Sequence, residues 1–335
     1  MAALSAPPHG SISPTALTLY ADLLQKVEAV QRQPGSISRK KVRGDTYLYV
    51  VEKHGQTRIQ RYLGPAENEQ AVEESTLIQA EAQHARSRRT QVSMLKRAGL
   101  PGPSLEVGRL LEAVSRAGLF ESGLVLVGTV AFSLYAPIVG AIPSAAFSMT
   151  QDADFAVASV ADTRGDADLT TVLRRADPSF QSAPGLHRTD LPRKFRASTG
   201  FEVEILTPVR NREDDGVVNI AGLGAGATPL HFMEFLIQDA IKAVALYNDG
   251  IKVTIPNPAR YAIHKLIVAQ ERSIGVAKRD KDLAQAGALI AILHANDPFL
   301  LHDIWEEART SGPKWRTNIE RSMKMLALTE EDLTP

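Results

Sequence analysis

Two carboxylates stand one residue apart in the segment SMTQDADFAV, residues 148–157. Asp152 and Asp154 are the acids, and the apolar residues Phe155 and Val157 follow them. This pattern is typical of a β-strand that begins at the acids. Alternate side chains of a strand share one face, so both carboxylates point the same way, with their Cα atoms roughly 6–7 Å apart. Like charges at this spacing repel each other unless a cation lies between them.

A divalent cation is the natural counter-charge for such a pair. Magnesium binds one or two carboxylates together with phosphate oxygens. Two such ions, about 3.5–4 Å apart, can hold the attacking and leaving oxygens of a phosphoryl transfer. The alternative is a solvated strand face without metal, because Asp-x-Asp is common by chance. The pair alone leaves both interpretations open.

Further residues near the pair suit the same chemistry. Glu202 and Glu204 alternate with apolar residues in FEVEILTP, residues 201–208, which places both acids on one strand face. An acid from a neighbouring strand is what a two-ion site needs as a third ligand. Gly128 and Thr129 follow an apolar strand and precede a helix, and such a turn lets phosphates approach backbone N–H groups.

Both helices and strands are needed to position these side chains. Apolar spacing predicts helices over residues 15–32, 66–98, 104–119, 129–136, 257–272 and 277–294, with further helix to about residue 328. A fully apolar run predicts a strand over residues 124–128. Strands are also predicted over residues 152–158 and 200–208, and hairpins over 45–64 and 243–256. Residues 33–40 and 210–230 lack either period, and we expect them to be irregular. LTTVLRRA is helix-like within the polar stretch 161–198.

Composition shifts divide the chain. Residues 1–14 are rich in Pro and Ser, and we expect a flexible N-terminus there. A helix–hairpin module, residues 15–100, ends at the linker Leu-Pro-Gly-Pro, residues 100–103. We expect a catalytic core over residues 104–256 and a helical region over residues 257–330.

Bulk composition excludes several classes of function. The 335 residues include no cysteine, which excludes disulfide scaffolds, thiol catalysis and Cys-ligated zinc. Lys plus Arg and Asp plus Glu both number 38, so overall charge argues neither for nor against a nucleic-acid partner. No basic segment followed by an apolar run marks a signal peptide at the N-terminus, and we expect a cytoplasmic protein.

One apolar segment raises a membrane alternative. Residues 122–147 are long enough to form a transmembrane helix. Gly128, Pro137, Gly140 and Pro143 interrupt the segment, which favours a buried strand, a turn and short helices instead. We therefore expect no membrane contact.

Basic residues gather around the expected N-terminal hairpin. They are Arg39, Lys40, Lys41 and Arg43 before it, and Arg86, Arg88, Arg89, Lys96 and Arg97 on the following helix. Tyr47, Tyr49 and Tyr62 lie within the hairpin, and positive charge beside aromatic rings is what RNA binding uses. The alternative is that the tyrosines pack on their own helix and the charges keep the surface soluble.

The order of these features resembles a known superfamily. Strand–Gly128–Thr129–helix, then Thr150-x-Asp152-x-Asp154, then a strand acid, resembles the DNA polymerase β-like nucleotidyltransferases. ARYAIHKLIVAQER followed by KRDKDLAQAGAL is similar to bacterial nucleotidyltransferase-fold proteins near the AbiEii-type abortive-infection toxins. Those proteins carry a Lys on one helix and an Arg/Lys-x-x-Lys-Asp pattern on the next.

The resemblance covers roughly residues 104–295 and implies a fold. It implies an α+β protein with a polymerase β-like mixed sheet flanked by helices, an N-terminal helix–β-hairpin–helix extension and a C-terminal helical part. It also assigns roles: Asp152, Asp154 and Glu204 as catalytic acids and metal ligands; Gly128, Thr129 and Thr150 beside the triphosphate; Lys265 and Lys281 neutralising phosphate; and Asp282 orienting a lysine or binding the nucleotide. Glu204 is preferred to Glu202 because VEILTP matches the family strand best. Without the resemblance, Lys265 is an exposed helix lysine and KRDKD a solvated face.

The resemblance also implies an activity. Two Mg²⁺ ions would serve transfer of a nucleoside monophosphate from a nucleoside triphosphate to a hydroxyl of an RNA, such as tRNA, or of a protein. Pyrophosphate would leave, and Glu204 would receive the acceptor proton. A toxin or defence role with an antitoxin partner is implied as well. The alternative is a nucleotidyltransferase fold whose site is degraded and which acts as a nucleic-acid-binding module.

Overall fold

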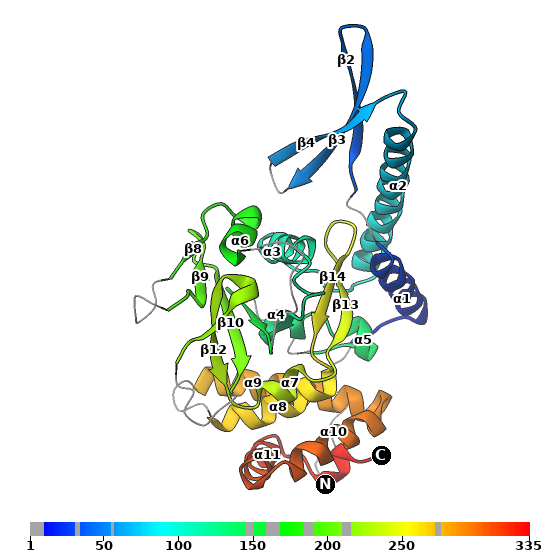
Figure 1. Ribbon diagram of the computed structural model, residues 1–335. Coiled ribbons are helices and arrows are strands. Elements are labelled where there is room, and N and C mark those ends of the chain that lie inside the picture. Colours follow the sequence, from blue (N-terminus) through cyan, green and yellow to red (C-terminus); the bar gives the residue numbers. More distant parts are fainter. Residues whose placement is uncertain are drawn as a thin grey trace.

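A mixed sheet with helices around it forms the centre of the computed structural model (Figure 1). The structure describes residues 10–30, 34–54, 57–144, 151–158, 168–183, 190–209, 216–271 and 276–335. The strands of the central sheet are β5 (Val125–Val127), β7 (Asp152–Ala156), β8 (Gln181–Ser182), β9 (Lys194–Arg196), β10 (Glu202–Pro208), β11 (Val218–Ile220) and β12 (Ala225–Leu230). The α+β class and the mixed, helix-flanked sheet expected from the sequence are confirmed.

Strand β10 lies in the middle of this sheet and organises its neighbours. It runs parallel to β7 on one side and to β12 on the other, and its first residues also pair antiparallel with β9. Strand β5 pairs antiparallel with β7 on the far side. The two expected acidic strands are therefore direct neighbours.

Helices form over the ranges that the sequence predicts, and a short helix over Met233–Ile237 forms where none was expected. They are α1 (Pro14–Glu28), α2 (Glu69–Arg97), α3 (Leu105–Arg116), α4 (Gly128–Phe132), α5 (Ala136–Val139), α6 (Leu169–Ala176), α7 (Met233–Ile237), α8 (Pro258–Glu271), α9 (Val276–Asn296), α10 (Pro298–Thr310) and α11 (Pro313–Met325). Ser104 accepts a hydrogen bond from the Val107 backbone N–H and caps α3. Beneath the sheet in Figure 1 lie α8 and α9.

The long apolar segment that suggested a membrane helix is broken up as its Gly and Pro residues predict. Residues 122–144 form β5, α4, α5 and the short strand β6 (Ala141–Ile142), which pairs with β1 (Gly10–Ser11). In the part of the chain that the structure describes, no helix has the length and apolarity needed to cross a membrane.

Two segments expected to be irregular contain strands. β11 and β12 lie within residues 210–230, where the small residues AGLGAGA lack the alternation of bulky apolar residues that marks a strand. Residues Ser36–Val42 form β2, which overlaps the expected break at residues 33–40. The segment SISRKKV is mostly polar because β2 is a largely exposed outer strand.

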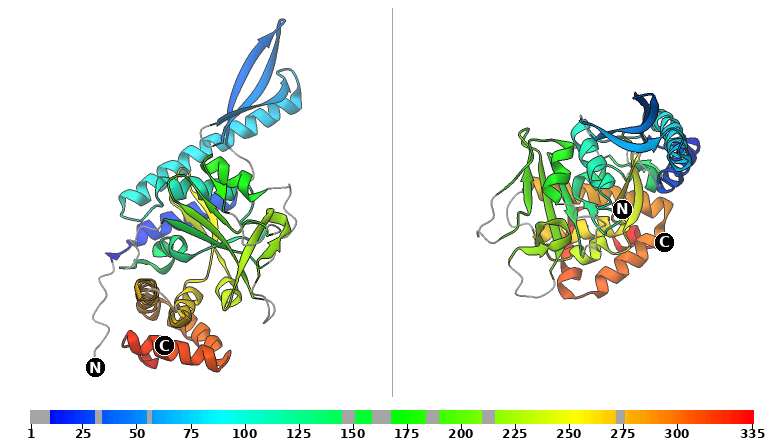
Figure 2. Two further views of the ribbon diagram at one scale, coloured as in Figure 1. Left: turned by 90° about the vertical axis from the view of Figure 1, so that its left-hand side faces the viewer. Right: turned by 45° about the horizontal axis from the view of Figure 1, so that its top comes forward.

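The N-terminal extension is consequently a three-stranded sheet rather than a simple hairpin. β2 pairs antiparallel with β3 (Asp45–His54), which pairs antiparallel with β4 (Thr57–Pro65). This sheet stands at one end of the long helix α2, away from the central sheet (Figure 2). α1 packs on the hairpin of β13 (Ile241–Ala245) and β14 (Ile251–Ile255), where the Tyr20 hydroxyl accepts from the Val244 N–H.

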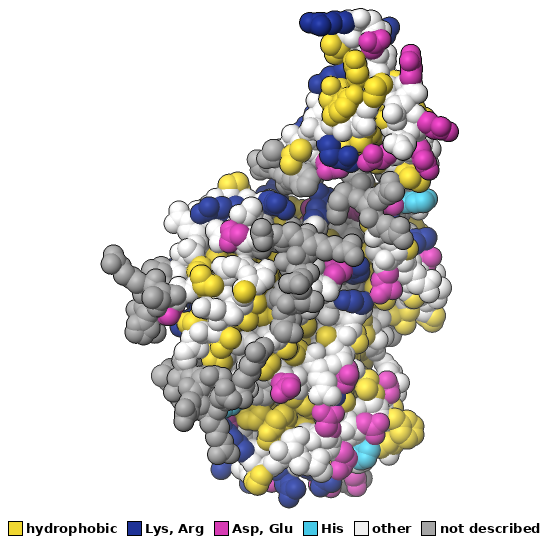
Figure 3. Space-filling view, in the orientation of Figure 1, with side chains coloured by type: hydrophobic (Ala, Val, Ile, Leu, Met, Phe, Trp, Pro, Cys, Tyr) yellow, Lys and Arg dark blue, Asp and Glu magenta, His cyan; other side chains and the backbone are white. Residues whose placement is uncertain are grey.

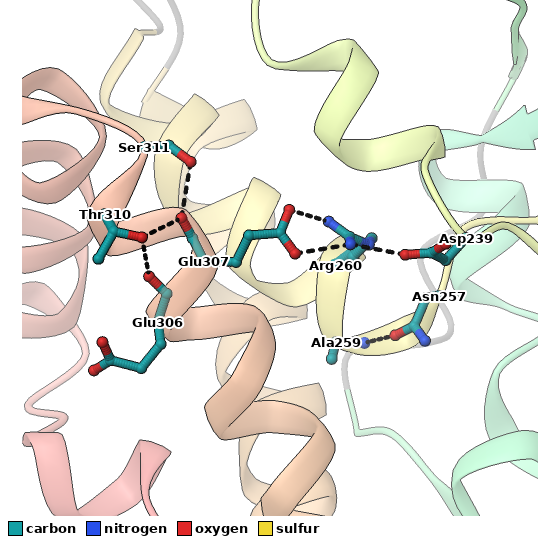
Figure 4. Close-up of polar contacts among 8 residues, drawn as sticks. All are labelled: Asp239, Asn257, Ala259, Arg260, Glu306, Glu307, Thr310 and Ser311. Carbon is teal, nitrogen blue, oxygen red and sulfur yellow. Dashed lines mark hydrogen bonds and ion pairs between the residues drawn. The ribbon is translucent and has the colours of Figure 1, made fainter.

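A buried arginine joins α8 to its surroundings. The Arg260 guanidinium, 2% exposed, donates to both carboxylate oxygens of Glu307 on α10, at 2.9 and 2.8 Å (Figure 4). It also donates to Asp239 at 2.8 Å and lies 4.9 Å from the centre of the Phe235 ring. These contacts join α8, the helix that carries Lys265, to α10 and α7 and to Asp239.

Candidate active site

The acids of β7 and β10 meet on one face of the central sheet. The parallel register places Asp152 opposite Glu202 and Asp154 opposite Glu204. Apolar residues alternate with them and face the core, among them Ala153, Phe155, Val203 and Ile205. The expected strand positions of Asp152, Asp154 and Glu204 are therefore those of the structure.

Asp154 has an unusually high proton affinity. Its pKa is raised from the ordinary 3.8 to about 6, chiefly because the carboxyl is buried. The negative charges of Asp152 and Glu204 add to this shift, while Lys265 and Lys194 oppose it. A cation beside Asp154 would offset the free-energy cost of burying its charge and the repulsion from the other two acids.

Glu204 is held by two residues from the strands beside it. Lys194 on β9 forms an ion pair of 3.0 Å with one carboxylate oxygen, and the Thr228 hydroxyl on β12 donates to the other at 3.0 Å. Glu202 pairs instead with the Arg196 Nε at 2.8 Å. The sequence did not point to Lys194 or Thr228, because both lie in segments that lack strand alternation.

Gly128 brings the backbone close to Asp154. It is the first residue of α4 and has φ +68°, in the left-handed region that favours glycine. A Cβ at this position would lie 2.7 Å from Asp154 Oδ2. The Tyr261 hydroxyl on α8 donates a hydrogen bond of 3.0 Å to the Gly128 carbonyl oxygen. Among the residues that the structure describes, no side chain caps the start of α4, so the N–H groups of this turn are left to another acceptor.

A buried ion pair faces the acids from α8 and α9. Lys265 is 8% exposed and its Nζ lies 2.5 Å from Asp282 Oδ1, with Asp282 itself 3% exposed. The interpretation of Lys265 as an exposed lysine is therefore wrong, and so is that of Asp282 as part of a solvated face. Burial lowers the pKa of Lys281, and Asp152 opposes this shift. Asp282 is therefore the ion-pair partner of Lys265.

Most of these groups, though not Lys194 or Tyr261, line one cleft of about 920 Å³. Its acids are Asp152, Asp154, Glu202, Glu204 and Asp282, and its cations are Arg196, Lys265, Lys278 and Lys281; Gly128 and Thr129 also line it. Thr150, expected beside the triphosphate, lies outside the described residues. The mixture of carboxylates and cations suits a polyanion that arrives with divalent cations.

A second cavity of about 450 Å³ adjoins the cleft. It shares Gly128, Asp154 and Lys265 with the cleft, and its other walls are mostly apolar and aromatic. His264 is buried and lines this cavity. A flat organic group could therefore lie beside the charged cleft.

The acids fit magnesium by their chemistry, although Glu204 has other partners. Carboxylate oxygens are the ligands Mg²⁺ prefers. The strand register brings the three acids together, and after burial the charges of Asp152 and Glu204 are the next causes of the raised pKa of Asp154. Among the described residues, no group of three His, Asp or Glu side chains is already arranged to hold one metal ion. Asp152 and Asp154 would hold Mg²⁺ directly, and Glu204 would join them once it leaves Lys194.

Comparison with known proteins places this site in a family. The nucleotidyltransferase family model matches residues 105–310, which include every described site residue. A search of curated proteins finds no match. A solved structure described as an antigenic nucleotidyltransferase-like protein from Paracoccidioides brasiliensis is 18% identical, with a TM-score of 0.31. The likeness covers 63% of this chain and 92% of that one.

The family model spans more than half of the chain and contains the paired acids, the glycine turn and the buried lysine. The chain therefore belongs to the nucleotidyltransferase family.

Proposed function

We propose that this nucleotidyltransferase is magnesium-dependent and transfers a nucleoside monophosphate from a nucleoside triphosphate to a hydroxyl of an RNA or protein acceptor. The observation that carries the proposal is the register of β7 and β10, which sets Asp154 opposite Glu204 and beside Gly128. When bound, Mg²⁺ would supply positive charge to the phosphates and to the acceptor oxygen.

The chain's own residues have distinct tasks in this proposal. Lys265 and Lys281 face the cleft and offset phosphate charge, and Asp282 holds the Lys265 ammonium in place. Gly128 and Thr129 present backbone N–H groups to phosphate oxygens. These groups position the triphosphate, and positioning with charge stabilisation is most of what phosphoryl transfer requires.

The reaction exchanges one phosphorus–oxygen bond for another. The acceptor hydroxyl oxygen bonds to the α-phosphorus, and the bond from the α-phosphorus to its bridging oxygen breaks. Pyrophosphate leaves with that oxygen. The hydroxyl proton passes to Glu204, whose carboxylate lies next to Asp154 on the same face.

Labelled nucleotides test the proposal. The full chain is incubated with Mg²⁺ and each triphosphate in turn, labelled at the α- or at the γ-phosphate, with total RNA or total protein as acceptor. The proposal expects acceptor labelling from the α-phosphate alone, dependent on Mg²⁺ and lost in Asp154→Asn. Labelling from the γ-phosphate would identify a kinase instead, and no labelling of either acceptor would overturn the proposal.

The toxin role rests on the similarity of residues 259–289 to proteins near the AbiEii-type toxins. If the chain is a toxin with an antitoxin partner, expressing it alone should slow bacterial growth, whereas Asp154→Asn should not. Equal growth of both strains would remove the toxin role and leave the transferase proposal standing.

A binding module with a degraded site is the second candidate. The ion pair between Lys194 and Glu204 favours it, because the third acid is engaged by a protein cation. In that case Mg²⁺ would bind no more tightly to the parent protein than to Asp154→Asn in a calorimetric titration.

A further inference from the structure

The two faces of the N-terminal sheet differ in what covers them. Leu48 and Val50 point to one face and are 2% and 0% exposed. That face packs on α2, where Arg61 of β4 pairs with Glu74 at 3.1 Å. The tyrosines of the sheet alternate with these residues and therefore point to the opposite face.

The opposite face carries a cluster of aromatic rings. Tyr47 and Tyr49 are next-but-one neighbours on β3, and Tyr62 lies across from Tyr49 on β4. The ring centroid of Tyr62 lies 5.4 Å from that of Tyr49 and 6.1 Å from that of Tyr47. Tyr62 is 50% exposed, so the cluster is open to solvent. The interpretation in which all three tyrosines pack on their own helix is wrong.

Positive charge surrounds the rings. Lys40 on β2 lies 4.8 Å from the centre of the Tyr49 ring, and its Nζ donates to Gln60 at 2.7 Å. Arg58 follows the same face of β4 by alternation. Residues 36–65 contain seven Lys and Arg against two Asp and Glu, a net charge of +5 in a chain that is neutral overall; by alternation, Arg39, Lys41 and Arg61 of this count lie on the face toward α2. Hydrophobic and basic side chains gather together over this sheet (Figure 3).

We propose that this face, here called the tyrosine face (Tyr47, Tyr49, Tyr62, Lys40, Arg58 and Gln60), binds single-stranded RNA. Bases stack on exposed rings regardless of sequence, and cations beside the rings neutralise the phosphates. The Gln60 amide can donate to a ribose 2′-hydroxyl, the group that distinguishes RNA from DNA. A protein partner with a basic surface would instead be repelled by the positive charge of the tyrosine face.

This inference rests on the proposed function in one respect: the RNA held on the tyrosine face is the acceptor of the transferred nucleotide. The sheet lies away from the central sheet, at the far end of α2 (Figure 2). Binding there would hold a long RNA by a segment distant from its reacting hydroxyl. The RNA would gain affinity from the tyrosine face without occupying the cleft.

Binding is measured on the full chain with EDTA and without nucleotide, so transfer cannot contribute. Fluorescence anisotropy compares a labelled oligo(U) RNA, an oligo(dT) of equal length, a duplex RNA and an oligo-Glu peptide. Single-stranded RNA should bind tightest, and its affinity should fall as salt rises. Equal or tighter binding of oligo(dT), duplex or peptide would overturn the proposal, as would no RNA binding.

Single substitutions assign the binding to the face. Tyr62→Leu should weaken RNA binding by roughly ten-fold, whereas Tyr62→Phe keeps the ring and should stay within about two-fold. Lys40→Gln should lower the slope of log affinity against log salt by about 0.7. Phe299→Leu, at a 70% exposed ring on α10, and Lys324→Gln, on α11, serve as controls and should bind as the parent does. Unchanged binding in Tyr62→Leu and Lys40→Gln would overturn the assignment.

The outcome separates the two proposals. Asp154→Asn should bind RNA as the parent does and transfer nothing. RNA binding by a parent protein that transfers no nucleotide would defeat the proposed function and keep the tyrosine face. Transfer to RNA that is equal in the parent and Tyr62→Leu would defeat the role of this face in holding the acceptor.

Discussion

Asp154 is the residue at which the demands of folding and function oppose each other. Its carboxyl is buried beside two other acids, so the charged form costs free energy in the folded protein. The same crowding makes the position suited to a divalent cation. Residues at functional sites often reduce stability in this way.

Neutralising Asp154 should abolish transfer. Asp154→Asn keeps the shape of the side chain but removes the charge that would bind Mg²⁺, and we expect the transfer rate to fall by at least about a thousand-fold. Glu202→Gln is the matched control, because Glu202 lies on the same face of β10 but pairs with Arg196. Its rate should stay within about five-fold of the parent's. Equal losses in both variants would indicate a general need for negative charge rather than a specific ligand.

The pH dependence of stability should reveal the raised pKa of Asp154. Between pH 3.8 and about 6 the folded protein binds a proton that the unfolded chain has released, so stability falls as pH rises through this window. Asp154→Asn removes this loss. In EDTA at pH 8 the variant should be more stable than the parent by about 3 kcal/mol, and at pH 4 by much less.

Urea unfolding at the two pH values measures this difference. Adding Mg²⁺ at pH 8 should stabilise the parent and leave the variant unchanged, because a ligand stabilises only the form that binds it. If the parent is the more stable protein at pH 8 in EDTA, the charged Asp154 carboxylate does not destabilise the folded protein as its burial implies.

The sequence indicated the two pairs of strand acids, at residues 152 and 154 and at residues 202 and 204, because alternation along a strand is a local property. The preference for Glu204 over Glu202 came from the family resemblance. The sequence did not indicate Lys194, Thr228 or Tyr261 as parts of the site. Lys194 and Thr228 reach Glu204 through strand pairing, and Tyr261 reaches the Gly128 carbonyl through helix packing. A single sequence carries no record of such contacts between distant segments.

At the scale of elements, the turn from β5 into α4 controls how closely the backbone approaches Asp154. Gly128→Ala adds a methyl group 2.7 Å from Asp154 Oδ2 at a positive φ. We expect the variant to lose most of its transfer activity, since Asp154 must move away from the cleft. Activity assays and urea unfolding together measure the effect.

Gly118→Ala supplies the matched control. Gly118 has φ +72°, close to the +68° of Gly128, but a Cβ there would meet nothing within 4 Å. It should lose about 1–2 kcal/mol of stability from backbone strain alone and keep its activity. Similar activity in the two variants would show that the contact with Asp154 is unimportant.

The element boundaries that the sequence missed have a common cause. β2 and β12 are strands whose side chains are polar or small, because β2 is largely exposed and β12 is rich in Gly and Ala. Hydrophobic alternation is a consequence of burial on one face, so strands built without it give no signal. The helices α3 and α8, by contrast, carry both an apolar face and a capping residue.

At the scale of the whole molecule, Arg260 connects the helix that carries Lys265 with the C-terminal helices. Arg260→Met should lower the free energy of unfolding by roughly 1.5–3 kcal/mol through lost charge-assisted hydrogen bonds. The cost stays below that of a stranded buried charge, because Asp239 and Glu307 are 66% and 41% exposed and regain water.

Arg309→Met tests whether this loss is specific. Arg309 pairs with Glu306 on the same helix and is 37% exposed, so its removal should change stability little. Urea denaturation of both variants gives the comparison. Equal destabilisation would mean that the contacts of Arg260 between α8 and α10 contribute nothing beyond a surface ion pair.

The position of the N-terminal helix α1 relative to the core could not be predicted from the sequence. The helical spacing of α1 shows that one face is buried but not that Tyr20 bonds to Val244, 224 residues away. Where elements meet is decided by packing between surfaces that only the folded chain brings together.

A crystal structure with Mn²⁺ and a non-hydrolysable nucleoside triphosphate tests the central claim most directly, because Mn²⁺ gives an anomalous signal in a magnesium site. We expect Mn²⁺ bound by Asp152 and Asp154, the triphosphate against Gly128 and Lys265, and Glu204 turned from Lys194 toward the metal. Manganese bound away from these acids, or Glu204 still paired with Lys194 beside a bound triphosphate, would contradict the account.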